Sequence, residues 1–155
     1  MKNKPIIITI TVTLILGLFA GAMITGKVAE NKLRYSYETS FAAYTDEAIS
    51  WLSQYLNDLT RKNKGEIIDE TLMERSKVLA AAAVANMEQT AILLNIDGYK
   101  DLNGTKYILA NKKEHSVDEV SEIFSALRML DNDPYDQDAY EALQQLENNS
   151  PQLDD

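Results

Sequence analysis

The sequence predicts an all-α protein in which a single N-terminal transmembrane helix precedes a four- or five-helix bundle-like domain. Three features predict this fold class: an uncharged run at residues 5–26, apolar residues at helical spacing after it, and helix-capping patterns at 116–119 and 138–141. We expect residues 1–4 to form a short tail, 5–26 the membrane helix, 27–147 one helical domain, and 148–155 a disordered acidic tail.

The uncharged run has the length of a membrane-spanning helix. Its 22 residues from Pro5 to Gly26 lie between Lys4 and Lys27, and at about 1.5 Å per residue they just cross a hydrocarbon core of roughly 30 Å. The alternative is a signal peptide, because Ala20-Gly21-Ala22 fits the small-x-small cleavage rule and cleavage there would leave a chain starting near Met23. The length favours an uncleaved anchor, since apolar signal cores usually span only about 7–15 residues.

Small residues recur every fourth position along this run. They form one ridge on a helix, which allows close packing between membrane helices and predicts possible self-association. The residues of this ridge are Thr9, Thr13, Gly17, Gly21 and Thr25.

The expected location is a bacterial inner membrane, with the helical domain in the periplasm or outside the cell. Basic residues flank the run on both sides, so the orientation is inferred from the four-residue tail on one side and a whole domain on the other. The chain has no cysteine, which excludes disulfides, thiolate zinc sites and cysteine nucleophiles.

The domain is expected to consist of helices joined by short loops. Apolar residues recur at helical spacing over 28–59 and again over 68–95. The first of these helices is expected to end in the basic residues that precede the glycine at position 65. Residues 95–104 (NIDGYKDLNG) are predicted to be a loop, and 105–113 a short helix rather than a strand. Ser116 to Glu119 is a capping box whose helix ends at 131–134, and Asp138 to Glu141 is predicted to cap the last helix.

Aromatic residues are concentrated on the first helix of the domain. They follow one apolar row and are either core rings or an exposed surface that binds a partner, since Tyr and Trp are favoured at binding hot spots. The candidate partner surface consists of Tyr37, Phe41, Tyr44, Trp51 and Tyr55.

Acidic residues accumulate in the last third of the chain. Residues 114–155 contain 12 acids and one base, Arg128, within a total net charge of −9. This charge repels nucleic acid and anionic lipid, so no nucleic-acid role is expected. The acidic segment serves either solubility or the binding of a basic protein partner.

Motifs for catalysis or cofactor binding do not occur in the sequence. There is no P-loop, dinucleotide glycine pattern or G-x-S-x-G turn, and the acidic loops do not match an EF-hand. The single histidine, His115, precedes the Ser116 cap among charged residues and is predicted to be a solvent-exposed linker residue. We therefore expect no enzyme activity, no cofactor and no metal site.

These observations favour a membrane-anchored, non-catalytic module that binds or scaffolds another protein. One alternative is a cleaved periplasmic inhibitor or immunity-type protein, whose acidic face would block a basic enzyme. Another is a small-molecule sensor bundle, which is less favoured because the usual layout of such receptors has a second membrane span.

Overall fold

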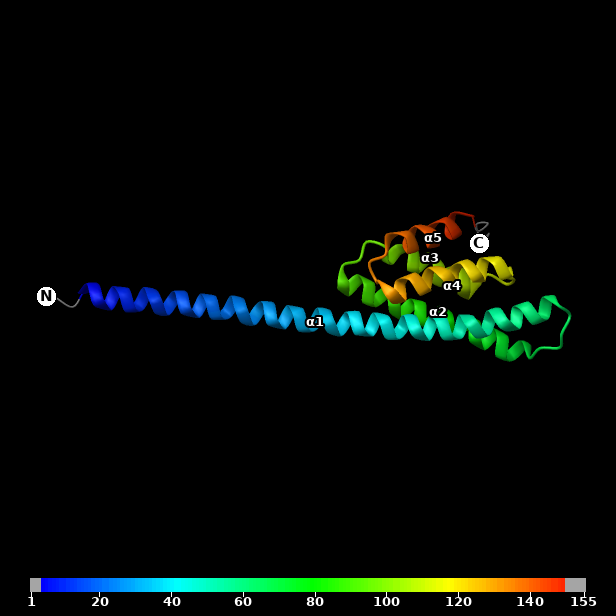
Figure 1. The fold of residues 1–155 in the computed structure, drawn as a ribbon, viewed down its shortest axis with the longest axis horizontal. Helices are drawn as coiled ribbons and strands as arrows, with labels where there is room; N and C mark the ends of the chain where they lie inside the picture. The colour runs from blue at the N-terminus through cyan, green and yellow to red at the C-terminus, as the bar shows by residue number, and fades with distance from the viewer. Residues whose placement is uncertain (1–3, 150–155) are drawn as a thin grey trace. The chain divides into compact units, whose positions relative to one another are not determined.

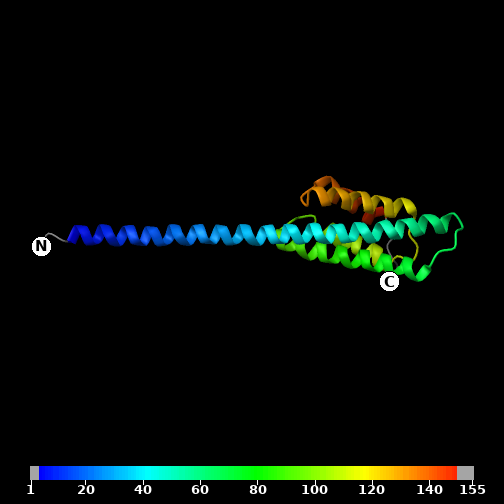
Figure 2. The ribbon, with the colours of Figure 1, turned by 60° about the horizontal axis from the view of Figure 1, so that its bottom comes forward.

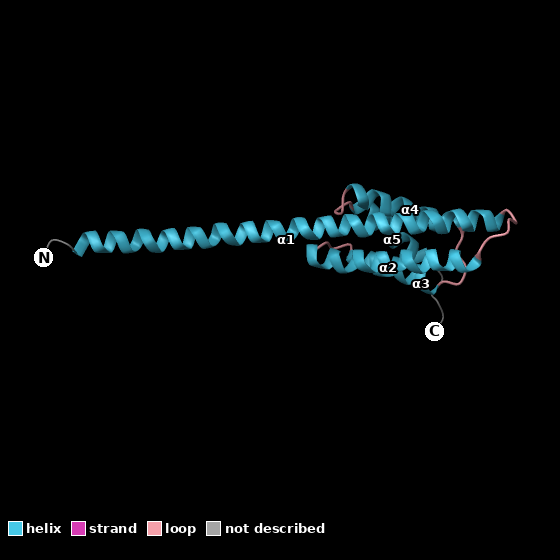
Figure 3. Cartoon of the chain, turned by 90° about the horizontal axis from the view of Figure 1, so that it is seen from below, coloured by secondary structure: helices cyan, strands magenta, loops and turns pink. Residues whose placement is uncertain are grey.

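The computed structural model describes the backbone of residues 4–149 and the side chains of residues 25–149. The described residues form five α-helices and no β-strand (Figure 3), as the all-α prediction required. The chain divides into two compact units, Met1–Ser36 and Tyr37–Asp155. The helices are α1 (Lys4–Asn63), α2 (Glu70–Leu94), α3 (Tyr99–Asn111), α4 (Val117–Asn132) and α5 (Gln137–Asn149).

The unit Tyr37–Asp155 is a helical bundle. Each helix in it runs antiparallel to the one before it (Figure 1, Figure 2). Helix α3 packs against α2 and α5, and α5 also packs against α4. The short connections account for this order, because loops of a few residues join antiparallel neighbours in helical bundles.

Helix α1 contributes one buried seam to this bundle. Its buried residues are spaced alternately four and three positions apart, which keeps them on one face of an α-helix. They are Phe41, Thr45, Ala48, Leu52, Tyr55 and Leu59, each between 0% and 7% exposed. The one polar member, Thr45, satisfies its hydroxyl by donating to the Phe41 carbonyl at 2.8 Å.

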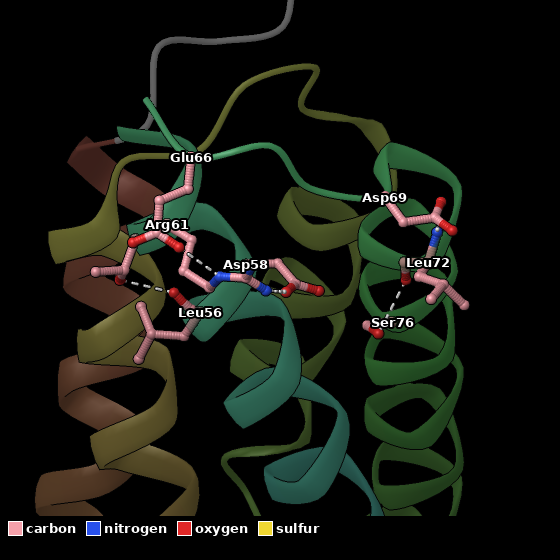
Figure 4. Close-up of polar contacts among 8 residues, drawn as sticks. Leu56, Asp58, Arg61, Glu66, Asp69, Leu72 and Ser76 are labelled. Atoms are coloured by element: carbon pink, nitrogen blue, oxygen red, sulfur yellow. Dashed lines mark hydrogen bonds and ion pairs between the residues drawn. The ribbon is translucent and has the colours of Figure 1, made fainter. Parts of the chain in front are cut away.

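The turn between α1 and α2 is formed by a glycine and a network of charged side chains. Gly65 has φ +76°, a conformation that favours glycine, and it follows the end of α1 as the sequence predicted. Figure 4 shows Arg61 between Asp58 and Glu66, with its Nε donating to Glu66 at 2.8 Å. Asp69 then caps α2, because its side chain accepts hydrogen bonds from the backbone N–H groups of Thr71 and Leu72.

Helix α2 is a core helix of the bundle. By length and composition it is the one helix among the described residues that could cross a membrane, yet half of its apolar stretch is buried inside the protein. That burial is expected of a central bundle helix, which must be apolar on several sides. The membrane helix expected at 5–26 lies outside the described side chains, except for Thr25 and Gly26.

Helix α3 starts earlier than the sequence predicted. Only residues 95–98 connect it to α2, so the expected loop over 95–104 was wrong from Tyr99 onward. The reason is that neither Gly98 nor Gly104 adopts the positive φ of a turn: Gly98 lies beside the Tyr140 ring just before the helix, and Gly104 lies inside the helix near the Glu147 carboxylate. Asn95, with φ 57°, ends α2 in the left-handed conformation that short polar side chains tolerate.

The cap predicted for α4 is observed, whereas the cap predicted for α5 is not. Ser116 Oγ accepts from the Glu119 N–H at 3.1 Å, so the predicted cap of α4 is confirmed. For α5 the predicted cap was wrong by two residues, because Asp136 and not Asp138 accepts from the Ala139 N–H at 3.1 Å. The Pro134 turn places Asp136 directly before the first helical residue.

Candidate functional site

The five aromatic residues of the candidate partner surface do not share one face. Phe41 and Tyr55 are 0% and 2% exposed and lie in the buried seam of α1. For these two residues the core interpretation holds, and neither can contact a partner in this conformation. Tyr37, Tyr44 and Trp51 are half-buried instead.

The three half-buried rings form a separate row. Tyr37, Tyr44 and Trp51 are seven residues apart, so they lie nearly above one another on α1. Tyr44 and Trp51 pack against the core along one side while keeping part of each ring accessible. This row, which we call the aromatic row, is the part of the predicted surface that a partner could reach.

Contacts from two connections between helices hold α1 in register beside this row. Tyr135, in the connection between α4 and α5, has its hydroxyl 3.2 Å from Glu38 Oε1, to which it donates a hydrogen bond. Near the other end of the seam, the rings of Tyr55 and His115 meet edge to face with centroids 5.8 Å apart. The aromatic row therefore lies on a segment that is fixed at both ends.

His115 is buried, and its predicted position as an exposed linker residue was wrong. The residue is 6% exposed and its side chain 0%. A local signal for this burial exists: the residue before an N-cap commonly packs against the fourth helical residue, which here is the fully buried Val120. Burial lowers the pKa of His115, the nearby Lys77 and Lys112 lower it further, and the Glu119 carboxylate opposes them.

Two further charged groups are buried without having been predicted. Lys77 is 6% exposed and pairs with Glu74 at 2.7 Å, and Glu88 is 8% exposed and accepts from Lys106 at 2.6 Å. The second pair joins α2 to α3. Both satisfy the requirement that a buried charge be paired, so they are structural contacts.

Burial and the neighbouring carboxylates of Glu74 and Glu119 raise the pKa of Tyr55 to about 12. The phenol therefore stays protonated over the physiological pH range and is unsuited to act as a base. No group of three or more His, Cys, Asp or Glu side chains within residues 25–149 is arranged to hold a metal ion.

The described residues line at least two depressions on the bundle. One, of about 250 Å³, is lined by Lys112, Ser116, Glu119 and Leu146 among others. The other, of about 180 Å³, lies where α2 meets α3 and includes Ile92, Ile96 and Tyr99. Both are small for a typical ligand site, which holds roughly 300–1,000 Å³.

Asp101 lies beside a second carboxylate. Burial raises the pKa of Asp101, the nearby Glu147 raises it further, and Lys100 opposes both. A folded-state pKa above the usual value means that ionisation of Asp101 costs stability as the pH rises through that pKa. The like charge of Glu147 contributes to this cost.

Replacing Glu147 by Gln should therefore stabilise the protein by about 0.5 kcal/mol near pH 7. The change removes the repulsion on Asp101, and it also removes a negative charge from the C-terminal end of α5, where the helix dipole disfavours it. Urea unfolding at about pH 7 and about pH 3 measures the effect. The gain should vanish at the lower pH, and Glu141→Gln, nearer the start of α5, should give none; equal gains at both pH values would contradict the pairing.

The predicted small-residue ridge lies mostly outside the described residues. Of its five members only Thr25 has a described side chain, which is exposed in the unit Met1–Ser36. The positions of Thr9, Thr13, Gly17 and Gly21 relative to another helix stay a prediction. The same is true of the predicted acidic tail from residue 150 onward, whereas residues 148 and 149 belong to α5.

Comparisons of the chain with protein-family models, with curated proteins and with solved structures each find no match.

Proposed function

We propose that the chain is a single-pass protein of a bacterial inner membrane whose helical bundle faces the periplasm or the exterior and binds another protein without catalysing a reaction. The observation that carries this proposal is the run of 22 residues without a charged side chain, from Pro5 to Gly26. In water such a run has no stable place outside a protein core, whereas it matches a bilayer in both length and composition.

The aromatic row is the proposed contact surface. Tyr37, Tyr44 and Trp51 offer partly exposed rings on a helix that the bundle holds in place, and such rings give large contact area at low entropic cost. The acidic residues of α4 and α5 would select a basic partner by charge. In the anchor, the ridge from Thr9 to Thr25 would allow two copies to pair.

Intact mass measurement combined with membrane fractionation tests the anchor. A full-length mass in the membrane fraction is the expected result. A soluble species that starts near Met23 would contradict the anchor, and it would favour the cleaved inhibitor, whose acidic face would then have to bind a basic enzyme. A sensor bundle would instead require a small molecule that shifts the thermal midpoint of the purified chain.

Replacing Tyr37 and Tyr44 together by Ser tests the contact surface. Because both rings are half-buried, we expect the double variant to lose its co-purifying partner from detergent-solubilised membranes while its thermal midpoint falls only slightly. Tyr107→Ser is the matched control, since Tyr107 is 52% exposed and belongs to α3, not to the aromatic row. Retention of the partner by the double variant, or its loss in the control, would contradict the proposed surface.

A further inference from the structure

His115 is a titratable residue whose imidazole ring is buried in the bundle. It lies in the connection between α3 and α4, one residue before the α4 cap, with its side chain 0% exposed. Neither ring nitrogen has a hydrogen-bond partner among the described residues. The nearest carboxylate oxygen, Glu119 Oε2, is 3.4 Å from Nδ1, longer than the usual N–H···O distance of about 2.7–3.2 Å.

Titratable and charged groups from three helices, and from Lys112 directly after α3, surround the ring. Helix α1 provides Tyr55, which meets the imidazole edge to face. Helix α2 provides the buried Lys77, whose ammonium pairs with Glu74. The C-cap of α3 provides Lys112, and α4 provides Glu119.

Glu119, the one carboxylate within residues 25–149 that acts on the ring, is already paired. Lys112 Nζ lies 2.9 Å from both carboxylate oxygens of Glu119, so this pair is complete without His115. A protonated imidazole would need two acceptors for its N–H groups and would stand near two ammonium groups. The site therefore fits the neutral ring and disfavours the charged one.

The direction of the pH dependence follows from this arrangement. Burial and the two lysines lower the pKa of His115 below 6.5. The imidazole therefore takes up a proton at a higher pH when it is exposed to water than when it is packed in the bundle. A group whose pKa is lowered on folding contributes stability above its unfolded value and loses it as the pH falls. Acid thus opposes the packed position of His115, starting near pH 6.5.

We propose that His115 is a proton-operated latch: as a neutral ring it holds the connection between α3 and α4 against Tyr55 of α1, and protonation releases this connection while the five helices stay formed. The connection is short and lies between two independent helix ends. Lys112 N–H bonds back to Ile108 in α3, and the Val120 N–H bonds to Ser116 at the start of α4. Residues 113–115 can therefore move outward without breaking either helix, which gives the charged imidazole access to water.

The chain provides one probe for each half of this proposal. His115 is the only histidine and Trp51 the only tryptophan, so an imidazole NMR signal and a fluorescence signal are each assigned without ambiguity. Trp51 lies one helical turn before Tyr55 on α1 and packs against the core. The experiment titrates the full chain in detergent micelles from about pH 8 to about pH 5.

The expected result is one reversible transition, with a midpoint below 6.5, shared by the imidazole signal and Trp51 fluorescence, while the helical circular dichroism stays unchanged. Glu119→Gln removes the opposing carboxylate and should move the midpoint to lower pH. Lys112→Met removes a repelling charge and frees Glu119 for the ring, so it should move the midpoint to higher pH.

The controls separate the latch from general acid unfolding. His115→Phe keeps a ring against Tyr55 and should abolish the fluorescence transition, whereas Glu147→Gln in α5 should leave it unchanged. Persistence of the transition in His115→Phe would overturn the proposal, and so would a titrating imidazole with constant Trp51 fluorescence. Loss of helical signal at the same midpoint would also overturn it. If His115→Phe does not fold, Lys112→Met decides, because Glu119 can then pair with the imidazolium in its packed position. The imidazole should then titrate with a smaller change in Trp51 fluorescence than in the unchanged protein, and an equal or larger change would contradict the latch.

Discussion

Replacing Gly98 by Ala should lower the free energy of unfolding by about 2 to 3 kcal/mol, as expected for an overpacked core position. Gly98 is buried in the connection before α3, and the added methyl group would overlap the ring of Tyr140. That ring has no free direction in which to move. Tyr140 is 2% exposed, and its hydroxyl donates to the Pro134 carbonyl at 2.9 Å.

Gly104→Ala is the matched control for this prediction. The added methyl group at Gly104 meets the carboxylate of Glu147, the end of a flexible and exposed side chain that can turn away into solvent. Because alanine is also favoured over glycine inside a helix by about 1 kcal/mol, this variant should be neutral or stabilising. Urea unfolding of both variants measures the difference. Equal losses of stability in both would show that Gly98 is not limited by the Tyr140 ring.

The same two glycines explain why the start of α3 could not be predicted from the sequence. Gly98 and Gly104 are turn formers when only neighbouring residues are considered. Their role in the bundle is set by Tyr140 and Glu147, which come from α5, far away in the chain. Ser116 and Gly65, in contrast, act through bonds and torsions of their own segments, so these helix ends were predictable.

The aromatic row shows the same limit within one helix. Positions 37, 44 and 51 are offset from 41, 48 and 55 by four residues, about 40° around an α-helix. Spacing places both rows on one broad apolar face, and only the packing of the other helices decides which row is buried. His115 was mispredicted for a related reason, since its neighbours in sequence are charged while its neighbours in space come from α1, α2 and α4.

Phe41→Ala should have the largest effect of any single change considered, a loss of about 3 to 5 kcal/mol in the free energy of unfolding. Phe41 is 0% exposed at the start of the buried seam of α1, so its removal leaves a cavity in the core of the bundle. Such a loss would consume much of the roughly 5–15 kcal/mol that stabilises a typical domain. Thermal and urea unfolding of the full chain in detergent measure it.

Tyr107→Ala removes a large ring from a position that is 52% exposed, and it should change stability by less than about 0.5 kcal/mol. The comparison also bears on function, because a residue that the fold needs cannot report on a binding partner. If Phe41→Ala proved as harmless as Tyr107→Ala, the first turns of α1 in the unit Tyr37–Asp155 would not be packed as described, and Phe41 would return to the candidate partner surface. If the large loss is found, any loss of partner binding in Phe41→Ala reflects a destabilised bundle. Only the half-buried Tyr37, Tyr44 and Trp51 can then separate binding from folding.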